Sequence, residues 1–160
     1  MADVFADGNT CVTFTSSIAN IALPTAAELN AGIRLQSFLT ADGLMGYEAT
    51  SAEVDTSSLA STFDTKTIGR DSFSGTGLRL KKQTYGADTP FSTLTRATSG
   101  FVTIRRGIVE TTAYASGQAI EVYPVTCGQT KFLAPTANSV QKYEVPTPIT
   151  SAPNLRAAVA

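Results

Sequence analysis

Alternation of apolar and polar side chains between residues 99 and 127 is the feature that most constrains the fold of this chain. The run S-G-F-V-T-I-R-R before Gly107 and the run A-I-E-V-Y after Ser116-Gly117 repeat every second residue, and both are rich in β-branched and aromatic residues. Because successive side chains of a strand point to opposite faces, these runs predict two half-buried antiparallel strands joined by a turn. Pro124 has no backbone N–H, so it predicts an edge position or a bulge in the second strand.

Shorter alternating stretches predict the remaining strands. Asp42-Gly43 is a turn signal, so we expect a hairpin in which residues 44–50 pair back on the strand before it. In the L-R-L-K stretch, alternation places Arg79 and Lys81 on an outer, cationic face. The expected strands are residues 11–15, 33–40, 78–81 and 140–145, with residues 155–160 as a terminal strand or a tail.

Two short helices are predicted from their capping residues. Thr25 with Glu28 three positions later forms the pattern of a capping box. Gly32 stands where a residue in the left-handed conformation commonly ends a helix. A second helix is predicted at residues 88–96, where a capping Asp or Thr precedes Pro90.

Two segments lack this regularity. Residues 51–70 are rich in small polar side chains and show little periodicity, which is typical of a functional or disordered segment, with a mobile loop as the alternative. Three prolines punctuate the segment at about 146–160, which we expect to be extended. Both segments contain too few apolar residues to offset the loss of conformational entropy on ordering. We therefore expect both to be mobile unless a neighbouring subunit orders them.

Composition excludes several classes of function. The chain has no histidine, which removes Ser-His-Asp and Cys-His catalysis and the commonest metal ligand. Cys11 and Cys127 are too few for a thiolate metal cluster, and we expect each to be a small, reduced, buried side chain. A net charge of -1 does not favour gripping duplex nucleic acid. We therefore predict no catalytic, cofactor or metal site.

The surface is expected to be poor in charge. Only 16% of the residues are charged, against about 25% in typical domains, and Thr, Ser and Ala take their place. A protein that buries much of its exterior in an assembly would show this, although an ordinary all-β domain explains it equally well. No stretch approaches the roughly 18 apolar residues of a membrane span, and the N-terminus lacks a signal-peptide pattern, so we expect a soluble cytosolic product.

Several segments, taken in order, carry a resemblance that covers nearly the whole chain. They are L-P-T-A-A-E-L-N-A-G-I-R-L at 23–35, T-A-D-G-L at 40–44, V-D-T-S-S-L-A-S-T-F at 54–63, D-T-P-F-S-T-L-T-R-A-T-S-G-F-V-T-I-R-R-G at 88–107, G-Q-A-I-E-V-Y-P-V-T at 117–126 and S-A-P-N-L-R-A-A-V-A at 151–160. Their order and the matching length resemble the major tail tube protein of long-tailed, siphovirus-type bacteriophages, particularly those that infect actinobacteria.

The resemblance implies a mainly β fold, in which residues 1–160 form one antiparallel β-sandwich domain with one or two short flanking helices. Its strands would close into an inner barrel in a hexameric ring, and stacked rings would form the tail tube, the conduit for DNA ejection into the host. The protein would be a structural component of the virion tail, made in the host cytoplasm. Its partners would be further copies of itself, other tail proteins at the tube ends, and phage DNA that passes without specific binding.

The resemblance also suggests two groups of functional residues. The segment at about 51–70 resembles the long assembly loop by which family members contact neighbouring subunits. Its candidate contact residues are Leu59, Phe63, Ile68 and Arg70. Glu110 and Glu121 are candidates for the lumen wall, because Glu121 points away from the face that its apolar neighbours bury and a negative wall would keep DNA phosphates from sticking. An outward, solvated glutamate is the alternative for each.

Three other functions stay open at this point. Another phage tail or head–tail joining protein would share the same segments. A monomeric β-sandwich binding module would need an aromatic platform, and Tyr47, Tyr85 and Tyr114 are scattered along the chain. An enzyme would need a working pair of carboxylates, such as Asp55 with Asp64, and such pairs are far more often solvated surface groups.

Overall fold

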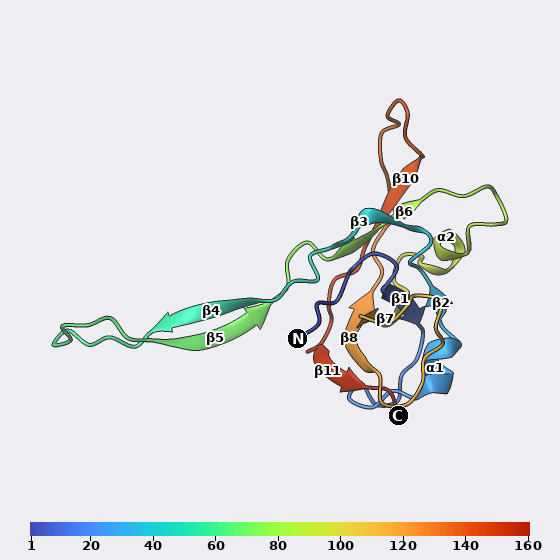
Figure 1. Ribbon diagram of the computed structural model, residues 1–160. Helices are drawn as coiled ribbons and strands as arrows, with labels where there is room; N and C mark the ends of the chain where they lie inside the picture. The colour runs from blue at the N-terminus through green and yellow to red at the C-terminus, as the bar shows by residue number, and fades with distance from the viewer.

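The computed structural model describes all of residues 1–160 and shows two antiparallel sheets, from which a two-stranded ribbon projects (Figure 1). The five-stranded sheet has the order β11-β8-β7-β1-β2 and consists of β1 (Thr10–Thr15), β2 (Ile33–Arg34), β7 (Ser99–Arg106), β8 (Ala119–Thr126) and β11 (Asn154–Ala158). The four-stranded sheet has the order β3-β6-β10-β9 and consists of β3 (Leu39–Met45), β6 (Gly77–Lys81), β9 (Lys131–Phe132) and β10 (Lys142–Pro146). Strands hold 39% of the residues and helices 6%, which confirms the predicted mainly β fold.

The predicted central hairpin is present as β7 and β8, but it is buried on both faces rather than on one. Val102 and Ile104 lie in the larger core cluster, which the two sheets share. Ile120 and Val122 lie in a second cluster on the opposite face, beneath α1 (Ala26–Asn30) and the end of the chain. The half-buried prediction was wrong because segments distant in sequence cover the second face.

The first helix confirms the predicted capping box and corrects the role of Gly32. Thr25 accepts a hydrogen bond from the Glu28 N–H at 3.2 Å, and Glu28 Oε2 accepts one from the Thr25 N–H at 2.8 Å. Gly32 is not in the left-handed region. A Cβ at this position would lie 2.6 Å from Thr13 Cγ2 and 2.8 Å from the Phe14 carbonyl oxygen, so glycine is required by close packing against β1.

The second helix is α2 (Thr89–Thr93), and Asp88 caps it as predicted by accepting the Phe91 N–H at 3.3 Å. The hairpin expected at Asp42-Gly43 is absent, because β3 runs through these residues and pairs with β6 instead. A Cβ at Gly43 would lie 2.6 Å from the Arg79 carbonyl oxygen, so this glycine also serves close packing. Of the strand expected at residues 33–40, only β2 and the first residues of β3 form.

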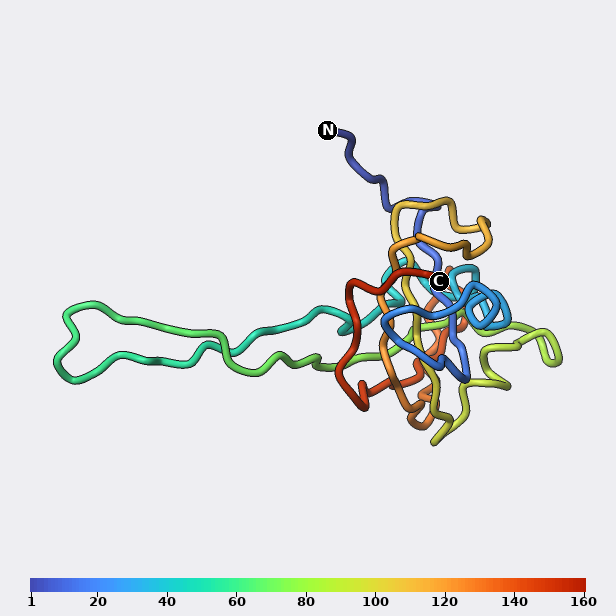
Figure 2. Tube along the Cα trace, turned by 90° about the horizontal axis from the view of Figure 1, so that it is seen from below, coloured from blue at the N-terminus to red at the C-terminus, as the bar shows by residue number.

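Half of the irregular segment at 51–70 forms strands. The strands β4 (Thr50–Asp55) and β5 (Lys66–Ser72) pair as an antiparallel ribbon that stands away from the two sheets (Figures 1 and 2). We call residues 50–72 the arm.

The C-terminal segment at 146–160 includes the terminal strand that was one of the two predictions for residues 155–160. Part of it forms β11, which pairs with β8, and Ala157 and Val159 are buried in the second cluster. This end of the chain therefore packs against the five-stranded sheet.

Pro124 lies in an inner strand, since β8 has β7 on one side and β11 on the other. It nevertheless stands where the β11 ladder is interrupted, between the pairing of Asn154 with Val122 and an isolated bridge at Val125. Cys11 and Cys127 are buried free thiols, which confirms their predicted role as small core side chains.

Candidate functional site

The molecule offers extended surfaces rather than a cleft that gathers reactive groups. No three His, Cys, Asp or Glu side chains are placed to hold a metal ion. Both helices are five residues long, which is far too short to cross a membrane. Three surfaces stand out: the arm, a groove at its root and the outward face of the four-stranded sheet.

The arm exposes apolar side chains that nothing in the chain covers. Every residue of β4 is exposed, and in β5 only Gly69 is partly buried. Of the predicted contact residues, Leu59 and Phe63 lie in the connection at the tip, whereas Ile68 and Arg70 lie on β5. An isolated two-stranded hairpin is marginally stable in water, so a ribbon of this length that exposes apolar side chains among polar ones is suited to contact a partner.

Polar contacts give the arm its local shape. Lys66 Nζ lies 2.7 Å from Glu53 Oε2, and both side chains are largely exposed. Near the tip, Thr56 donates its N–H to the Thr65 carbonyl oxygen at 2.9 Å. These contacts hold the two strands in register and leave the apolar side chains free.

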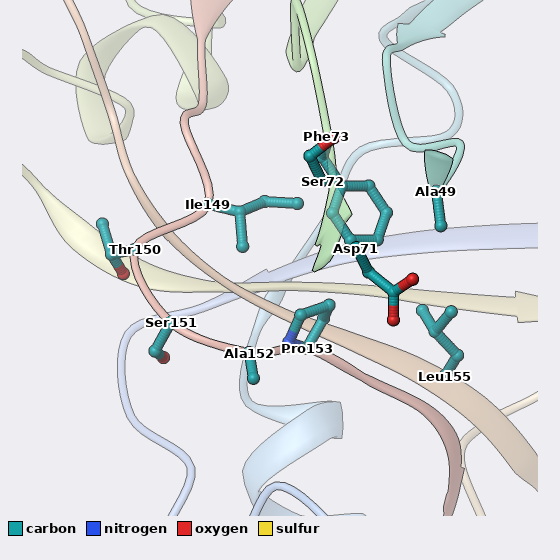
Figure 3. Close-up of a pocket in the computed structure, with 10 residues that line it drawn as sticks. All are labelled: Ala49, Asp71, Ser72, Phe73, Ile149, Thr150, Ser151, Ala152, Pro153 and Leu155. Atoms are coloured by element: carbon teal, nitrogen blue, oxygen red, sulfur yellow. The ribbon is translucent and has the colours of Figure 1, made fainter. Parts of the chain in front are cut away.

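A groove of about 500 Å³ lies where the arm meets the body (Figure 3). Phe73 forms part of its wall and packs edge-on against Tyr123, with ring centroids 5.8 Å apart. Ile149 and Leu155 line the side formed by the C-terminal segment, and Asp71 is the one ionisable residue of the lining. A single carboxylate among apolar and hydroxyl groups offers no acid–base pair, so the groove is better suited to packing than to chemistry.

The outward face of the four-stranded sheet carries a row of alternating charges that we call the charge ladder. It consists, from edge to edge, of Asp42 on β3, Arg79 on β6, Glu144 on β10 and Lys131 on β9. Arg79 pairs with Asp42 on one side and with Glu144 Oε1 at 2.8 Å on the other. Lys131 Nζ lies 3.5 Å from Glu144 Oε2. The ladder therefore links all four strands of the sheet.

Hydrogen bonding favours the charged forms of Arg79 and Asp42 in this ladder. Bonds to Glu144 raise the pKa of Arg79 above its ordinary value, outweighing a partial loss of hydration. The Thr40 hydroxyl donates to Asp42 Oδ1 at 2.7 Å, and this bond is the main reason why the pKa of Asp42 lies below its ordinary value. Sequence alternation predicted the cationic row on β6 but did not predict its ion pairs with Asp42 and Glu144.

The same face carries excess positive charge. Lys81 and Lys142 are directly opposite each other on β6 and β10, an arrangement of like charges that destabilises a sheet. Together with the ladder they give four cations and two carboxylates, a net charge of +2. No second layer of the chain packs over this face (Figure 1).

The two glutamates predicted from the sequence lie elsewhere and are engaged within the chain. Glu121 accepts from Arg106 Nε at 2.8 Å and from the Tyr123 hydroxyl at 2.9 Å, and its side chain is 23% exposed. Glu110 accepts from Gln36 Nε2 at 2.7 Å. Glu121 points away from the face that Ile120 and Val122 bury, as expected, but its own face of β8 also carries core residues such as Tyr123.

Sequence reasoning missed the fully buried Arg105. Its guanidinium donates to the carbonyl oxygens of Val109, Thr112 and Ala113 at 3.2, 2.7 and 3.2 Å, and to Gln118 Oε1 at 2.9 Å. It therefore fixes the connection between β7 and β8, which carries Glu110. Alternation alone places Arg105 on the same face as Phe101 and Thr103, and only the cover over that face reveals its role.

The chain is similar to a known protein family and to a solved structure. A family model described as "Phage tail tube protein" matches residues 1–160. No curated protein matches the chain. Among solved structures, a chain of "the anti-feeding prophage (AFP) baseplate, 6-fold symmetrised", determined by cryo-EM, is 11% identical with a TM-score of 0.58. The match covers 94% of this chain and 95% of that one, which shows a shared fold.

Proposed function

The chain belongs to the phage tail tube protein family, and from this premise we propose that its copies join into hexameric rings that stack into the tail tube of a siphovirus-type phage. The family makes it a structural tail protein and a component of the virion. In the proposed tube the open four-stranded sheets of the ring close into an inner barrel, and phage DNA passes through on its way into the host. An actinobacterial host and synthesis in the host cytoplasm are parts of the same proposal.

The arm is the observation that carries the proposal. It presents exposed apolar side chains on a two-stranded ribbon that no other layer of the chain covers. These side chains add no stability to a monomer, because they stay in contact with water. At about 3.3 Å per residue, an arm of roughly eleven residues a side extends some 35 Å, enough to reach a neighbouring copy. We propose that Leu59, Phe63, Ile68 and Arg70 contact adjacent subunits, within a ring or between rings.

Two surfaces compete for the lumen wall. Glu110 and Glu121 remain candidates, although both accept hydrogen bonds within the chain. The outward face of the four-stranded sheet is the stronger candidate, because no second layer covers it. Lys81→Glu and Glu121→Lys in infective particles separate the two: the variant whose side chain lines the channel changes the salt dependence of DNA ejection, since a lysine near phosphates adds salt-sensitive attraction.

Electron microscopy of the purified full-length chain, together with sedimentation velocity over a range of concentrations, tests the tube itself. Long hollow tubes are the expected result, and replacing residues 51–70 with Asn-Gly should abolish them while leaving the two sheets folded. Persistent monomer at high concentration, also with other tail proteins present, would contradict the proposal and favour a binding module. Rings that never elongate would favour another tail or head–tail joining protein.

A further inference from the structure

The charge ladder ends in opposite charges at the two edges of the four-stranded sheet. Asp42 stands on the edge strand β3 and Lys131 on the edge strand β9. Both terminal side chains are exposed, at 67% and 63%, whereas Arg79 and Glu144 between them are 28% and 12% exposed. The inner pair is therefore satisfied within the chain, and the two ends are accessible to a second molecule.

Both ends retain unused capacity for an ion pair. Lys131 Nζ has one carboxylate neighbour, at 3.5 Å, and an ammonium group has three donors. Asp42 accepts from Arg79 and from the Thr40 hydroxyl, and an ionised carboxylate can accept about four hydrogen bonds. Each end can thus accept one more partner of opposite charge without losing its present contacts.

The two edges resist pairing with arbitrary strands. The pairing of β3 with β6 shifts register between Leu39 and Leu44, which marks a bulge, and β9 is only two residues long. Bulged and very short edge strands are the usual protection against unspecific edge-to-edge association. A contact between these edges therefore depends on matching side chains more than on a long backbone ladder.

We propose that Asp42 of one subunit pairs with Lys131 of the next, so that the charge ladder continues without interruption around the ring and sets the register of neighbouring sheets. The proposal rests on the ring assembly proposed above. An acid at one edge and a base at the other make a head-to-tail contact, the type that closes into a ring when the rotation between copies permits. Complementary charge at such a contact selects the partner and its register.

Charge reversal at one end tests the pairing. Asp42→Lys places two cations at every junction, and Lys131→Glu places two carboxylates there. Each variant alone should raise the protein concentration needed for assembly by about tenfold or more, because like charges in contact disfavour association. Glu48→Lys and Arg96→Glu, which alter exposed charges away from the ladder, should assemble as the wild type does.

Mixing the two variants is the decisive step. In an equimolar mixture, Lys at position 42 of one variant meets Glu at position 131 of the other, and the second type of junction keeps the original pair. Assembly should return, with the two variants alternating in a ring that has an even number of subunits. A defect caused by repulsion inside each chain, against Arg79 or Glu144, would persist in the mixture.

The outcomes separate this pairing from the proposed function. Wild-type protein that never assembles would overturn the tube and the pairing together. Wild-type rings alongside variants that assemble normally would overturn the pairing alone. Variants that fail singly and still fail when mixed would also overturn it, because the loss would then be intramolecular.

Discussion

Replacing the apolar tip of the arm should abolish assembly without changing the stability of the subunit. Leu59 is fully exposed and Phe63 is 78% exposed, so neither contributes to the core of the free chain. Full burial of such side chains on assembly would contribute about 1.5–3 kcal/mol each. Leu59→Ser with Phe63→Ser should therefore weaken each contact by about 3–6 kcal/mol, roughly a 10²- to 10⁴-fold loss in association constant. Contacts that bury the tip only partly would give the lower end of this range.

Sedimentation velocity measures the concentration at which half of the protein is assembled, and thermal unfolding at low concentration reports the free subunit. Tyr85→Ser is the matched control, because Tyr85 is equally exposed but lies in the loop between β6 and α2. The control should assemble normally, and all variants should melt within a few degrees of the wild type. Normal assembly of the double variant would refute the role of the tip, and a large drop in its melting temperature would refute the claim that the tip makes no contact in the free subunit.

Three further predictions concern the subunit itself. Arg105→Met should lower the free energy of unfolding by about 2–4 kcal/mol, because the β7–β8 connection loses four hydrogen bonds from a buried guanidinium. Arg106→Met, which removes a partly exposed ion pair, should lower it by about 1 kcal/mol or less; urea unfolding compares the two variants, and equal losses would contradict the role of Arg105. Gly32→Ala should lower the free energy of unfolding by about 1–3 kcal/mol in the same assay, because the added methyl group clashes with β1. An unchanged unfolding midpoint would show that β1 shifts to accommodate the methyl group. Burial raises the pKa of Asp88, but hydrogen bonds from Gln83, Lys82, Tyr143 and Phe91 outweigh it and hold that pKa below 3.8. The stability that ionised Asp88 contributes is therefore complete above the pKa of Asp88 in the unfolded chain, and it is lost as the pH falls through the pKa of Asp88 in the folded chain. Asp88→Asn should thus be less stable than the wild type at pH 7 and should lose less stability below pH 4. Acid titration of the unfolding midpoint measures both effects.

Local signals in the sequence predicted the elements whose chemistry is local. The capping box at Thr25 and the cap at Asp88 involve residues within three positions of each other, and the alternation that predicts β7 and β8 requires only neighbouring residues. The role of Gly32 was not accessible in this way. A glycine that ends a helix and a glycine that is crowded by another strand look the same until β1 is placed beside α1.

The strands of the arm could not be predicted from sequence periodicity either. Alternation marks a strand only when one of its faces is buried, because burial is what selects apolar residues at every second position. The strands of the arm have both faces exposed, so their sequence carries small polar residues on each side and resembles that of a loop. The same property that concealed the strands makes the arm a candidate for contact between copies.

Some residues of the charge ladder could be placed from the sequence, and others could not. Alternation along β6 and β10 is enough to place Arg79 and Glu144 on the same face. Asp42 joins them only because β3 bulges between Leu39 and Leu44, and no periodic pattern predicts that shift. The acidic end of the ladder, on which the proposed junction depends, is thus positioned by a backbone irregularity. An irregular edge of this kind hinders pairing with arbitrary strands, whereas a long regular edge invites it.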